Sequence, residues 1–393
     1  MGQQRVQKIT STGCDLGLGD RQRAWVEIDL SAIKHNIREL KSILLPKTAL
    51  MAVVKADAYG HGAVTVAKTV IEAGADWLGV ATVPEGIELR SSGIESPILI
   101  LGATYTTEQI EAVAHWQLHP TLGSVDAAIL YSQTLKDNLP VHLKLDTGMS
   151  RLGLSWQQAV EFVQLVHSLP HLQIASIYSH LATAESSDRT VMNLQQQRFE
   201  TAIAQLADIN LPLPCKHLAN SAATLIAPSL HYDLVRVGLA VYGLYPATSL
   251  QSAVNLKPVL QVKARITQVK TIAPQTGVSY GHKFISDRTT LIAVVGIGYA
   301  DGVPRNLSNQ MMVIIRGKKV PQIGAITMDQ LMLDVSVIPD LEPGEIVTLL
   351  GIDGNEQISA DDWAKQLNTI SWEILCSFKH RLPRIALEKS ASK

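Results

Sequence analysis

Cysteine is scarce in this chain, and the few cysteines that it has lie far apart in the sequence. Cys14, Cys215 and Cys376 form no C-x-x-C pair and no even-numbered set. This excludes a zinc knuckle, and it excludes the disulfide framework of a small secreted domain. The chemistry of the protein therefore has to come from other side chains.

An excess of either charge is also missing, since 34 Lys and Arg residues stand against 35 Asp and Glu residues. A balanced chain has no electrostatic footprint for nucleic acid or for an anionic membrane. No apolar run approaches the roughly 18 residues of a membrane-spanning helix. The N-terminal segment, which is polar over about twenty residues, lacks the apolar centre of a signal peptide. We therefore expect a soluble cytoplasmic protein whose partners are small molecules or a second copy of itself.

The chain does have a regular alternation of short apolar runs and amphipathic helical segments. Continuous apolar runs are typical of strands buried on both faces, and a helix after each one indicates parallel βαβ units. Eight such runs favour a closed (β/α)8 barrel, although an open doubly wound sheet would have the same pattern. The runs cover residues 49–57, 77–82, 97–103, 117–122, 141–147, 173–181, 216–220 and 233–243.

The pattern changes near Lys257 and Pro258, after which long alternating runs are separated by Gly and Pro turns. Such runs, with no helices between them, predict antiparallel strands. A length of 393 residues also exceeds what one core usually fills. We therefore predict an α/β + β protein with a polar extension over residues 1–23, a barrel over residues 24–257 and a mostly β domain over residues 258–393.

Polar residues gather where the predicted barrel strands end, which is the face on which barrel enzymes carry their chemistry. One alone would be a solvated lysine or a satisfied buried histidine, but several on one rim indicate a site, because unpaired buried charges are costly. These residues are Lys55, Lys144, Asp146, Thr147, Arg151, His180, Asn220, Ser221, Arg236 and Gly238.

The last two strands of the predicted barrel point to a phosphate site. Barrels commonly bind phosphate at the loops after strands seven and eight. Here those loops offer the Ser221 hydroxyl and backbone N–H groups that Gly238 leaves approachable. A phosphate site opposite Lys55 suggests a phosphorylated carbonyl cofactor whose aldehyde forms a Schiff base with that lysine.

Seven motifs in order resemble those of the alanine racemases, and the resemblance covers the chain after about residue twenty. They are AVVKADAYGHG, LKLDTGMSRLG, HLANSAA, VRVGLAVYG, VSYGH, GYADGVPR and MDQLMLDV. The resemblance implies a fold-type III enzyme that uses pyridoxal 5′-phosphate, with a barrel, a C-terminal β domain and a head-to-tail homodimer whose sites are shared between subunits. It also implies a supply of D-alanine for cell-wall peptidoglycan.

Carried over by motif, the resemblance assigns roles to individual residues. Lys55 would hold the cofactor as an aldimine and act as one base, and Tyr280 from the partner chain would be the other. Arg236 would face the pyridine nitrogen, and Arg151 the phenolate oxygen and the substrate carboxylate; Met328 would reach the substrate from the partner. The remaining cofactor-pocket residues would be Tyr59, Leu101, His180, Asn220, Ser221, Gly238 and Leu239.

Racemisation itself requires two acid/base groups, one on each face of the substrate, because the α-proton leaves one face and returns to the other. Tyr280 in VSYGH therefore favours racemisation over decarboxylation, which needs no second base. Three alternatives stay open: a racemase for serine or larger side chains, a fold-type III decarboxylase, and a non-catalytic cofactor carrier. A methyl-sized pocket discriminates weakly against small additions.

Two positions depart from the family pattern, and one lysine invites a modification. His380 stands where the family usually has tyrosine, either facing the cofactor phosphate or turned to solvent, and Thr327 stands where cysteine is common. We expect Lys144 to be carbamylated, because an anion there would orient Arg151, whereas a second cation would repel it. The alternative is a simple ion pair between Lys144 and Asp146.

Overall fold

The chain divides into two compact units, which a computed structural model describes over residues 5–8, 23–208, 214–378 and 380–388. The barrel unit comprises Ala32–Ala58 and Ala63–Lys257. The β unit comprises Met1–Ser31, Tyr59–Gly62 and Pro258–Lys393. Within the described residues, no helix is both long enough and apolar enough to span a membrane.

The barrel unit contains eight parallel strands, each matching one of the apolar runs of the sequence. Their order is β10-β9-β7-β6-β5-β4-β3-β11, and the short β8 (Leu154–Ser155) pairs with β7. The eight are β3 (Ala49–Val53), β4 (Trp77–Val80), β5 (Ile98–Ile100), β6 (His119–Leu122), β7 (Leu139–Asp146), β9 (Leu172–Tyr178), β10 (Cys215–His217) and β11 (Leu234–Val237).

Two backbone hydrogen bonds link the end strands β10 and β11 and nearly close this sheet. Asp233 N donates to Lys216 O at 3.0 Å, and Arg236 N donates to Ala219 O at 3.0 Å. The predicted (β/α)8 barrel is therefore confirmed, and the open doubly wound sheet is not what the chain forms. The strands are apolar on both sides because one side packs in the barrel interior and the other against helices.

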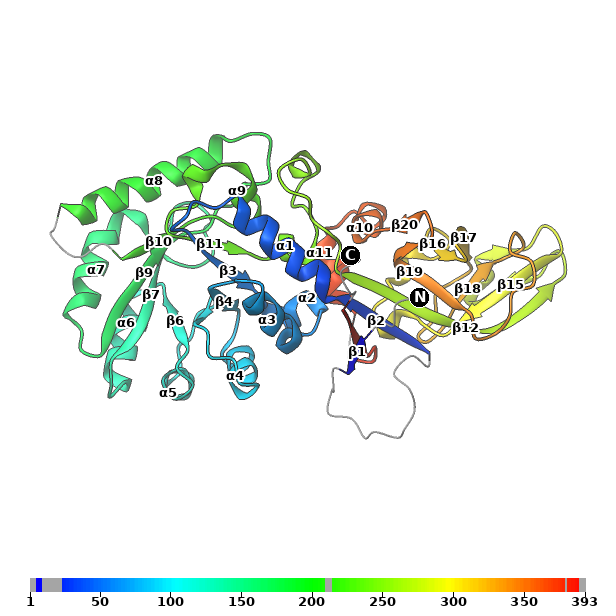
Figure 1. The fold of residues 1–393 in the computed structure, drawn as a ribbon, viewed down its shortest axis with the longest axis horizontal. Helices are drawn as coiled ribbons and strands as arrows, with labels where there is room; N and C mark the ends of the chain where they lie inside the picture. The colour runs from blue at the N-terminus through cyan, green and yellow to red at the C-terminus, as the bar shows by residue number, and fades with distance from the viewer. Residues whose placement is uncertain (1–4, 9–22, 209–213, 379, 389–393) are drawn as a thin grey trace. The chain divides into compact units, whose positions relative to one another are not determined.

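Helices lie on the outer side of the barrel strands, as Figure 1 shows for α4 to α8. Their starts follow local capping chemistry: Thr106 and Ser124 each accept a hydrogen bond from a backbone N–H in the first turn. The helices are α1 (Leu30–Ser42), α2 (Lys55–Gly60), α3 (Ala63–Glu72), α4 (Val83–Ser91), α5 (Thr107–His115), α6 (Val125–Thr134), α7 (Ala159–Ser168), α8 (Thr190–Ala207) and α9 (Ser221–Ile226).

The β unit is built on six antiparallel strands that pair in a closed cycle, β12-β15-β18-β17-β16-β19 and back to β12. Three further strands, β2, β21 and β1, extend the sheet from β12, and β20 pairs with β19. The strands are β1 (Arg5–Lys8), β2 (Ala24–Asp29), β12 (Leu260–Ile272), β13 (Gly277–Val278), β14 (Phe284–Ile285), β15 (Thr290–Val295), β16 (Met312–Ile315), β17 (Lys318–Ile323), β18 (Leu331–Asp334), β19 (Ile346–Asp353), β20 (Glu356–Ile358) and β21 (Arg384–Glu388).

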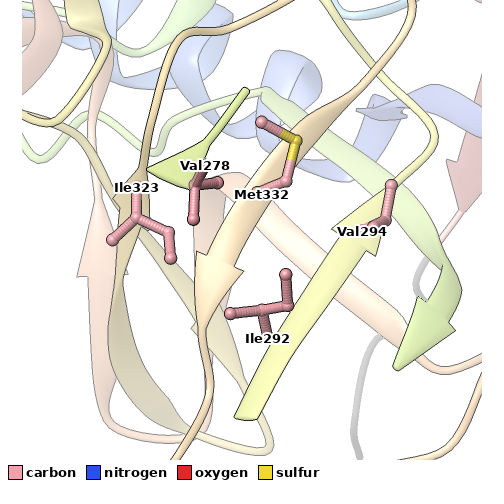
Figure 2. Packing of buried hydrophobic residues seen from close by; sticks show 5 residues of the cluster. All are labelled: Val278, Ile292, Val294, Ile323 and Met332. Atoms are coloured by element: carbon pink, nitrogen blue, oxygen red, sulfur yellow. The ribbon is translucent and has the colours of Figure 1, made fainter. Parts of the chain in front are cut away.

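One apolar cluster of the β unit lies under the hairpin of β13 and β14. Figure 2 shows its side chains, which come from β13, β15, β17 and β18: Val278, Ile292, Val294, Ile323 and Met332. Alternation along β15 and β18 places these residues on one face, as the period of two requires. Two helices near the C-terminus, α10 (Ala360–Leu367) and α11 (Ser371–Ser377), complete the unit.

The N-terminal strand β2 lies in the β unit, which differs from the expected start of the barrel domain at residue 24. It pairs with β12 and β21. The side chains explain this pairing: Glu27 forms an ion pair with Lys263 at 3.0 Å, and the Trp25 ring lies under the Arg265 guanidinium. Within the predicted extension over residues 1–23, β1 pairs with β21, while residues 1–4 and 9–22 lie outside the described residues.

Candidate active site

Lys55 lies just after β3, at the start of a left-handed helical turn. The four residues that follow it, Ala56 to Tyr59, have φ values between 53° and 55°, so α2 is a left-handed helical turn. This backbone costs roughly 1–2 kcal/mol per residue with an L side chain. Strain of this kind concentrates at functional sites, where the surrounding structure holds it in place.

Glu85 holds the beginning of this turn. Its Oε1 accepts a hydrogen bond from Ala56 N at 2.7 Å, and its Oε2 accepts from Ala81 N at 2.7 Å and Thr82 N at 3.1 Å. One carboxylate therefore fixes the residue after Lys55 to the end of β4. Sequence reasoning missed Glu85; its position three residues after the N-cap Thr82, in a capping box, was the available signal.

Cationic side chains converge at the carboxyl ends of the barrel strands. Lys144 is only 6% exposed, and its Nζ lies 4.8 Å from the centre of the Tyr178 ring. Burial, followed by the charges of Arg236, Arg151 and Lys55, lowers the pKa of Lys144 to about 7. These four groups are thus close enough for their charges to act on one another.

The expected alternative for Lys144, an ion pair with Asp146, does not form among the described residues. Asp146 Oδ1 instead accepts hydrogen bonds from the backbone of the following loop, at 2.8 Å from Gly148 N, 2.9 Å from Met149 N and 3.1 Å from Ser150 N. The carboxylate therefore shapes the loop that carries Arg151, and its charge only partly offsets the effects that lower the pKa of Lys144.

Arg236 is buried inside the barrel and is held by four acceptors. Its Nη1 donates to His217 Nδ1 at 2.9 Å. Its Nη2 donates to the carbonyl oxygens of Ser179 and Leu218 at 2.7 and 3.1 Å and to His180 Nδ1 at 3.1 Å. No hydrogen bond among the described residues uses its Nε. Burial lowers the pKa of Arg236 to about 10, so the guanidinium stays charged near neutral pH.

The two histidines that accept from Arg236 are neutral. Burial first, and then the charge of Arg236, keeps the pKa of both His180 and His217 well below the usual value. His217 also stacks on the Tyr178 ring, with 4.5 Å between ring centres and 6° between planes. Sequence reasoning missed His217 and Tyr178, whose only signal was a polar or aromatic residue at the end of a buried strand.

The turns after β10 and β11 meet at the Ser221 hydroxyl. Ser221 Oγ accepts from Gly238 N at 3.0 Å and lies 3.5 Å from Ala240 N, and Asn220 caps the short helix α9 through Ala223 N. Backbone N–H groups and a hydroxyl thus lie together at the rim, as the sequence predicted. Because the Gly238 N–H is engaged by Ser221 Oγ, the Ser221 hydroxyl hydrogen is the donor of this pair that is left for a phosphate oxygen.

The β unit presents two of the predicted site residues on its surface. Tyr280 is 73% exposed and Met328 is 53% exposed. Tyr280 follows Ser279, which has φ of 63° and whose Oγ donates to Ala325 O at 2.7 Å. The Met328 segment is fixed by Tyr299 N, which donates to Thr327 O at 3.0 Å, and by Ala300 N, which donates to Met328 O at 3.1 Å.

Two protein-family models together match most of this chain. Residues 28–246 match the model of the alanine racemase N-terminal domain, and residues 259–386 match that of the C-terminal domain. The chain belongs to the alanine racemase family. It is 66% identical to an alanine racemase of Nostoc sp., across 95% of this chain and 98% of the relative. It is 62% identical to one of Synechocystis sp., across 93% and 100% respectively.

Solved structures of alanine racemases share the fold. The enzyme from Streptomyces lavendulae, a producer of D-cycloserine, has a TM-score of 0.88 at 35% identity, over 95% of this chain and 99% of that one. The Bacillus anthracis alanine racemase with bound L-Ala-P has a TM-score of 0.89 at 32% identity, over 96% and 97%. The predictions of fold, family and isomerase activity are confirmed.

Alanine racemases depend on pyridoxal 5′-phosphate, and the donor set of this site fits that cofactor. The rim of the barrel holds a cluster of cations, which suits a phosphate and a carboxylate. A buried arginine with a spare Nε–H suits the pyridine nitrogen, which accepts a hydrogen bond. The Ser221 turn suits the phosphate, and Lys55 is the amine that the aldehyde requires.

The structure brings the predicted site residues together only in part. Within the barrel unit, Lys55, Lys144, Arg151, His180 and Arg236 lie close enough for their charges to interact. Leu101 packs near Gly79, beside Met51. Asn220, Ser221, Gly238 and Leu239 also belong to the barrel unit. Four predicted residues belong to the β unit, in which Tyr59 is buried, while Tyr280, Met328 and His380 are exposed. Their roles, and the phosphate contact of His380, stay predictions.

Proposed function

We propose that the chain interconverts L-alanine and D-alanine by a two-base mechanism, with Lys55 carrying pyridoxal 5′-phosphate. The observation that carries the proposal is the convergence of Lys144, Arg151 and Arg236 on the rim where the strained turn presents Lys55. A cationic rim stabilises the phosphate and the substrate carboxylate, both of which are anions. When bound, the cofactor supplies an electron sink that makes the α-proton removable.

The cofactor-binding residues divide by the part of the ligand that they suit. Ser221, Gly238 and Leu239 would hold the phosphate through a hydroxyl and backbone N–H groups, with Asn220 bracing the helix start and Tyr59 adding a hydroxyl. Leu101 would pack against the ring. Arg236 would donate from Nε to the pyridine nitrogen.

Arg236 would both bind the cofactor and limit side reactions. Its pKa of about 10 keeps it protonated at neutral pH, and its other N–H groups are already engaged by His217, His180 and two carbonyls. It would therefore donate a hydrogen bond to the pyridine nitrogen and keep its proton, whereas an aspartic acid would transfer its proton to that nitrogen. The ring then withdraws less charge, which disfavours side reactions such as transamination.

Two bases on opposite faces carry the proton transfer. Lys55 Nζ would take the α-proton of D-alanine on one face, and Tyr280 Oη would take that of L-alanine on the other; whichever group is protonated returns its proton from its own face. Arg151 would bind the substrate carboxylate through the guanidinium fork. Met328 would border the methyl group of alanine.

We further propose that Tyr280 and Met328 serve the site of a second copy, so that the enzyme is a homodimer. Tyr280 and Met328 are 73% and 53% exposed, and hydrogen bonds hold the loops that carry them, so both side chains are accessible to a second copy. An isologous dimer would bury both and would complete two sites at once.

Activity is tested by incubating the purified protein with L-alanine and following D-alanine by chiral chromatography. Serine, lysine and arginine serve as competing substrates, and Lys55→Met is the inactive control. Formation of D-alanine by the native chain alone supports the proposal. Absence of product with saturating cofactor, or faster turnover of another amino acid, contradicts it.

Shared sites are tested by mixing two inactive variants, Lys55→Met and Tyr280→Phe, under conditions that exchange subunits. If each site takes Lys55 from one chain and Tyr280 from the other, half of the dimers are mixed and each has one intact site. Activity should then return to about a quarter of that of the native enzyme. If both residues come from the same chain, no intact site exists and the mixture stays inactive.

A further inference from the structure

A row of polar side chains crosses the interior of the barrel, where apolar layers are usual. It begins at His119, the first residue of β6, and continues through His142 on β7, Ser176 on β9 and His217 on β10 to Arg236 on β11. Each residue comes from the next of five successive strands. The row thus leads from one end of the barrel to the guanidinium that faces the proposed cofactor site.

Neighbouring members of this row are all within hydrogen-bond distance. His119 Nδ1 lies 3.0 Å from His142 Nε2, and His142 Nδ1 lies 2.5 Å from Ser176 Oγ. Ser176 Oγ lies 2.8 Å from His217 Nε2, and His217 Nδ1 lies 2.9 Å from Arg236 Nη1. Both nitrogens of His142 and of His217 are therefore engaged.

The positive charge at one end fixes the direction of every bond. Arginine can only donate, so His217 Nδ1 accepts and its hydrogen sits on Nε2. His217 Nε2–H then donates to Ser176 Oγ, whose hydroxyl hydrogen donates to His142 Nδ1. By the same rule His142 Nε2–H donates to His119 Nδ1. If every bond ran the other way, His217 would carry its hydrogen on Nδ1. This N–H would then point at the Nη1–H of Arg236, and the two hydrogens would repel each other.

Two structural details support this row as a built feature. A β-bulge in β9 shifts the register between Val141↔Ile174 and His142↔Ser176, and this places Ser176 opposite His142. Bulges re-aim side chains and are common beside active sites. Secondly, His142, Ser176 and His217 are almost fully buried, so any unmade hydrogen bond would leave a desolvated polar group.

The outer end of the row borders a pocket of about 780 Å³, which His119 lines together with Leu118, Leu139 and Pro140. The rings stay neutral along its length: burial lowers the pKa of His119 to about 4 and that of His142 well below the usual value. A neutral imidazole has one N–H donor and one nitrogen acceptor. Each ring can therefore accept one hydrogen bond from the Arg236 side of the row and donate one toward the His119 side.

We propose that His119, His142 and Ser176 are positioning residues for Arg236. Arg236 sets the Nε2–H tautomer of His217, and the row supplies the acceptor that this buried N–H needs, so that the ring keeps Nδ1 aimed at Nη1 and Nε stays turned to the rim. Without the row, the buried Nε2–H of His217 would lack an acceptor, the ring would turn, and Arg236 would lose the acceptor that holds its Nη1. The effect of this row on how Arg236 meets the cofactor rests on the proposed function. The hydrogen-bonding state of His217 does not.

The first test reads the tautomer directly. Histidine labelled with ¹⁵N is incorporated into the holoenzyme, and two-bond ¹⁵N–¹H correlation spectra show which ring nitrogen carries hydrogen. The His217 resonances are assigned by their loss in His217→Gln. We expect hydrogen on Nε2 of both His217 and His142. Hydrogen on Nδ1 of His217, or a charged His142, overturns the proposal whether or not the enzyme racemises alanine.

The second test cuts the row at its middle. In Ser176→Ala we expect the ¹H and ¹⁵N resonances of the His217 Nε2–H group to shift, because that N–H loses its acceptor, and kcat to fall about tenfold with KM changed less than about twofold. Ser176→Thr keeps the hydroxyl and should restore these resonances. Ser132→Ala is the matched control, because Ser132 is buried but donates to the Pro170 carbonyl on the outer helix side. Unchanged His217 Nε2–H resonances and unchanged kcat in folded Ser176→Ala, or equal effects in Ser132→Ala, refute the role.

Discussion

Removal of carbon dioxide should change the charge state of Lys144, and the structure gives the size of the effect. Burial and three neighbouring cations lower the pKa of this lysine from 10.5 to about 7. Each pKa unit corresponds to about 1.4 kcal/mol, so holding the charged form in the folded chain costs on the order of 5 kcal/mol. At pH 8 about nine in ten Lys144 side chains would be neutral, against about three in a thousand for an ordinary lysine.

A neutral amine is the form that reacts with carbon dioxide. The Nζ lone pair bonds to the carbon, one C–O π pair moves to oxygen, and the nitrogen releases a proton to give a carbamate. The new anion would lie among Arg151, Arg236 and Lys55, where it removes repulsion and orients the Arg151 guanidinium. We therefore expect Lys144 to be carbamylated in bicarbonate buffer at pH 8.

Carbamylation is measured by ¹³C NMR after equilibration with ¹³C-bicarbonate. The native chain should give a carbamate resonance that disappears on acidification, and Lys144→Met, which keeps a similar volume without an amine, should give none. No resonance in the native chain, or one that persists in Lys144→Met, refutes the reasoning.

Without carbon dioxide, the same pKa makes stability depend on pH. The folded chain binds fewer protons than the unfolded chain between about pH 7 and 10.5, because its Lys144 pKa is the lower one. Stability relative to Lys144→Met should therefore rise with pH across that window and be lowest below pH 7. Chemical unfolding of both proteins in degassed buffer measures it, and parallel stability curves would contradict the burial argument.

Four further outcomes follow from the site. Borohydride reduction should attach the cofactor to Lys55, and peptide mapping that places the label on another lysine would rule this out. Tyr280→Phe should lose α-proton exchange from L-alanine far more than from D-alanine, which single-turnover deuterium exchange measures; equal losses would disprove the face assignment. His380→Ala should speed cofactor dissociation, because a ring N–H that donates to the phosphate is lost, whereas His380→Tyr, which keeps a donor, should slow it again; identical dissociation rates in all three proteins would mean that His380 does not touch the phosphate. Glu85→Ala should destabilise the chain by about 2 kcal/mol through loss of its bond to Ala56 N, and unchanged thermal unfolding would show that the left-handed turn needs no such anchor.

Much of the barrel could be predicted because its signals are local. Each apolar run between helical segments became a strand, and Lys55, His180 and Ser221 come directly after the ends of three of these strands or within a few residues of them. The prediction placed the β2 strand in the barrel domain, whereas it pairs with strands of the β unit. Its six residues alone do not indicate with which sheet it will pair. Its place depends on Lys263 and Arg265, which lie far along the chain.

The sequence by itself determined the family and the barrel, because period, capping and motif spacing depend on residues that are near each other in the chain. Only the tertiary structure decided which groups act together. The anchoring of Ala56 by Glu85 and the bulge that turns Ser176 toward His142 both join distant segments. So does the depressed pKa of Lys144, since its desolvation and the fields of Arg151, Arg236 and Lys55 arise only when the folded chain buries Lys144 and brings these charges near it.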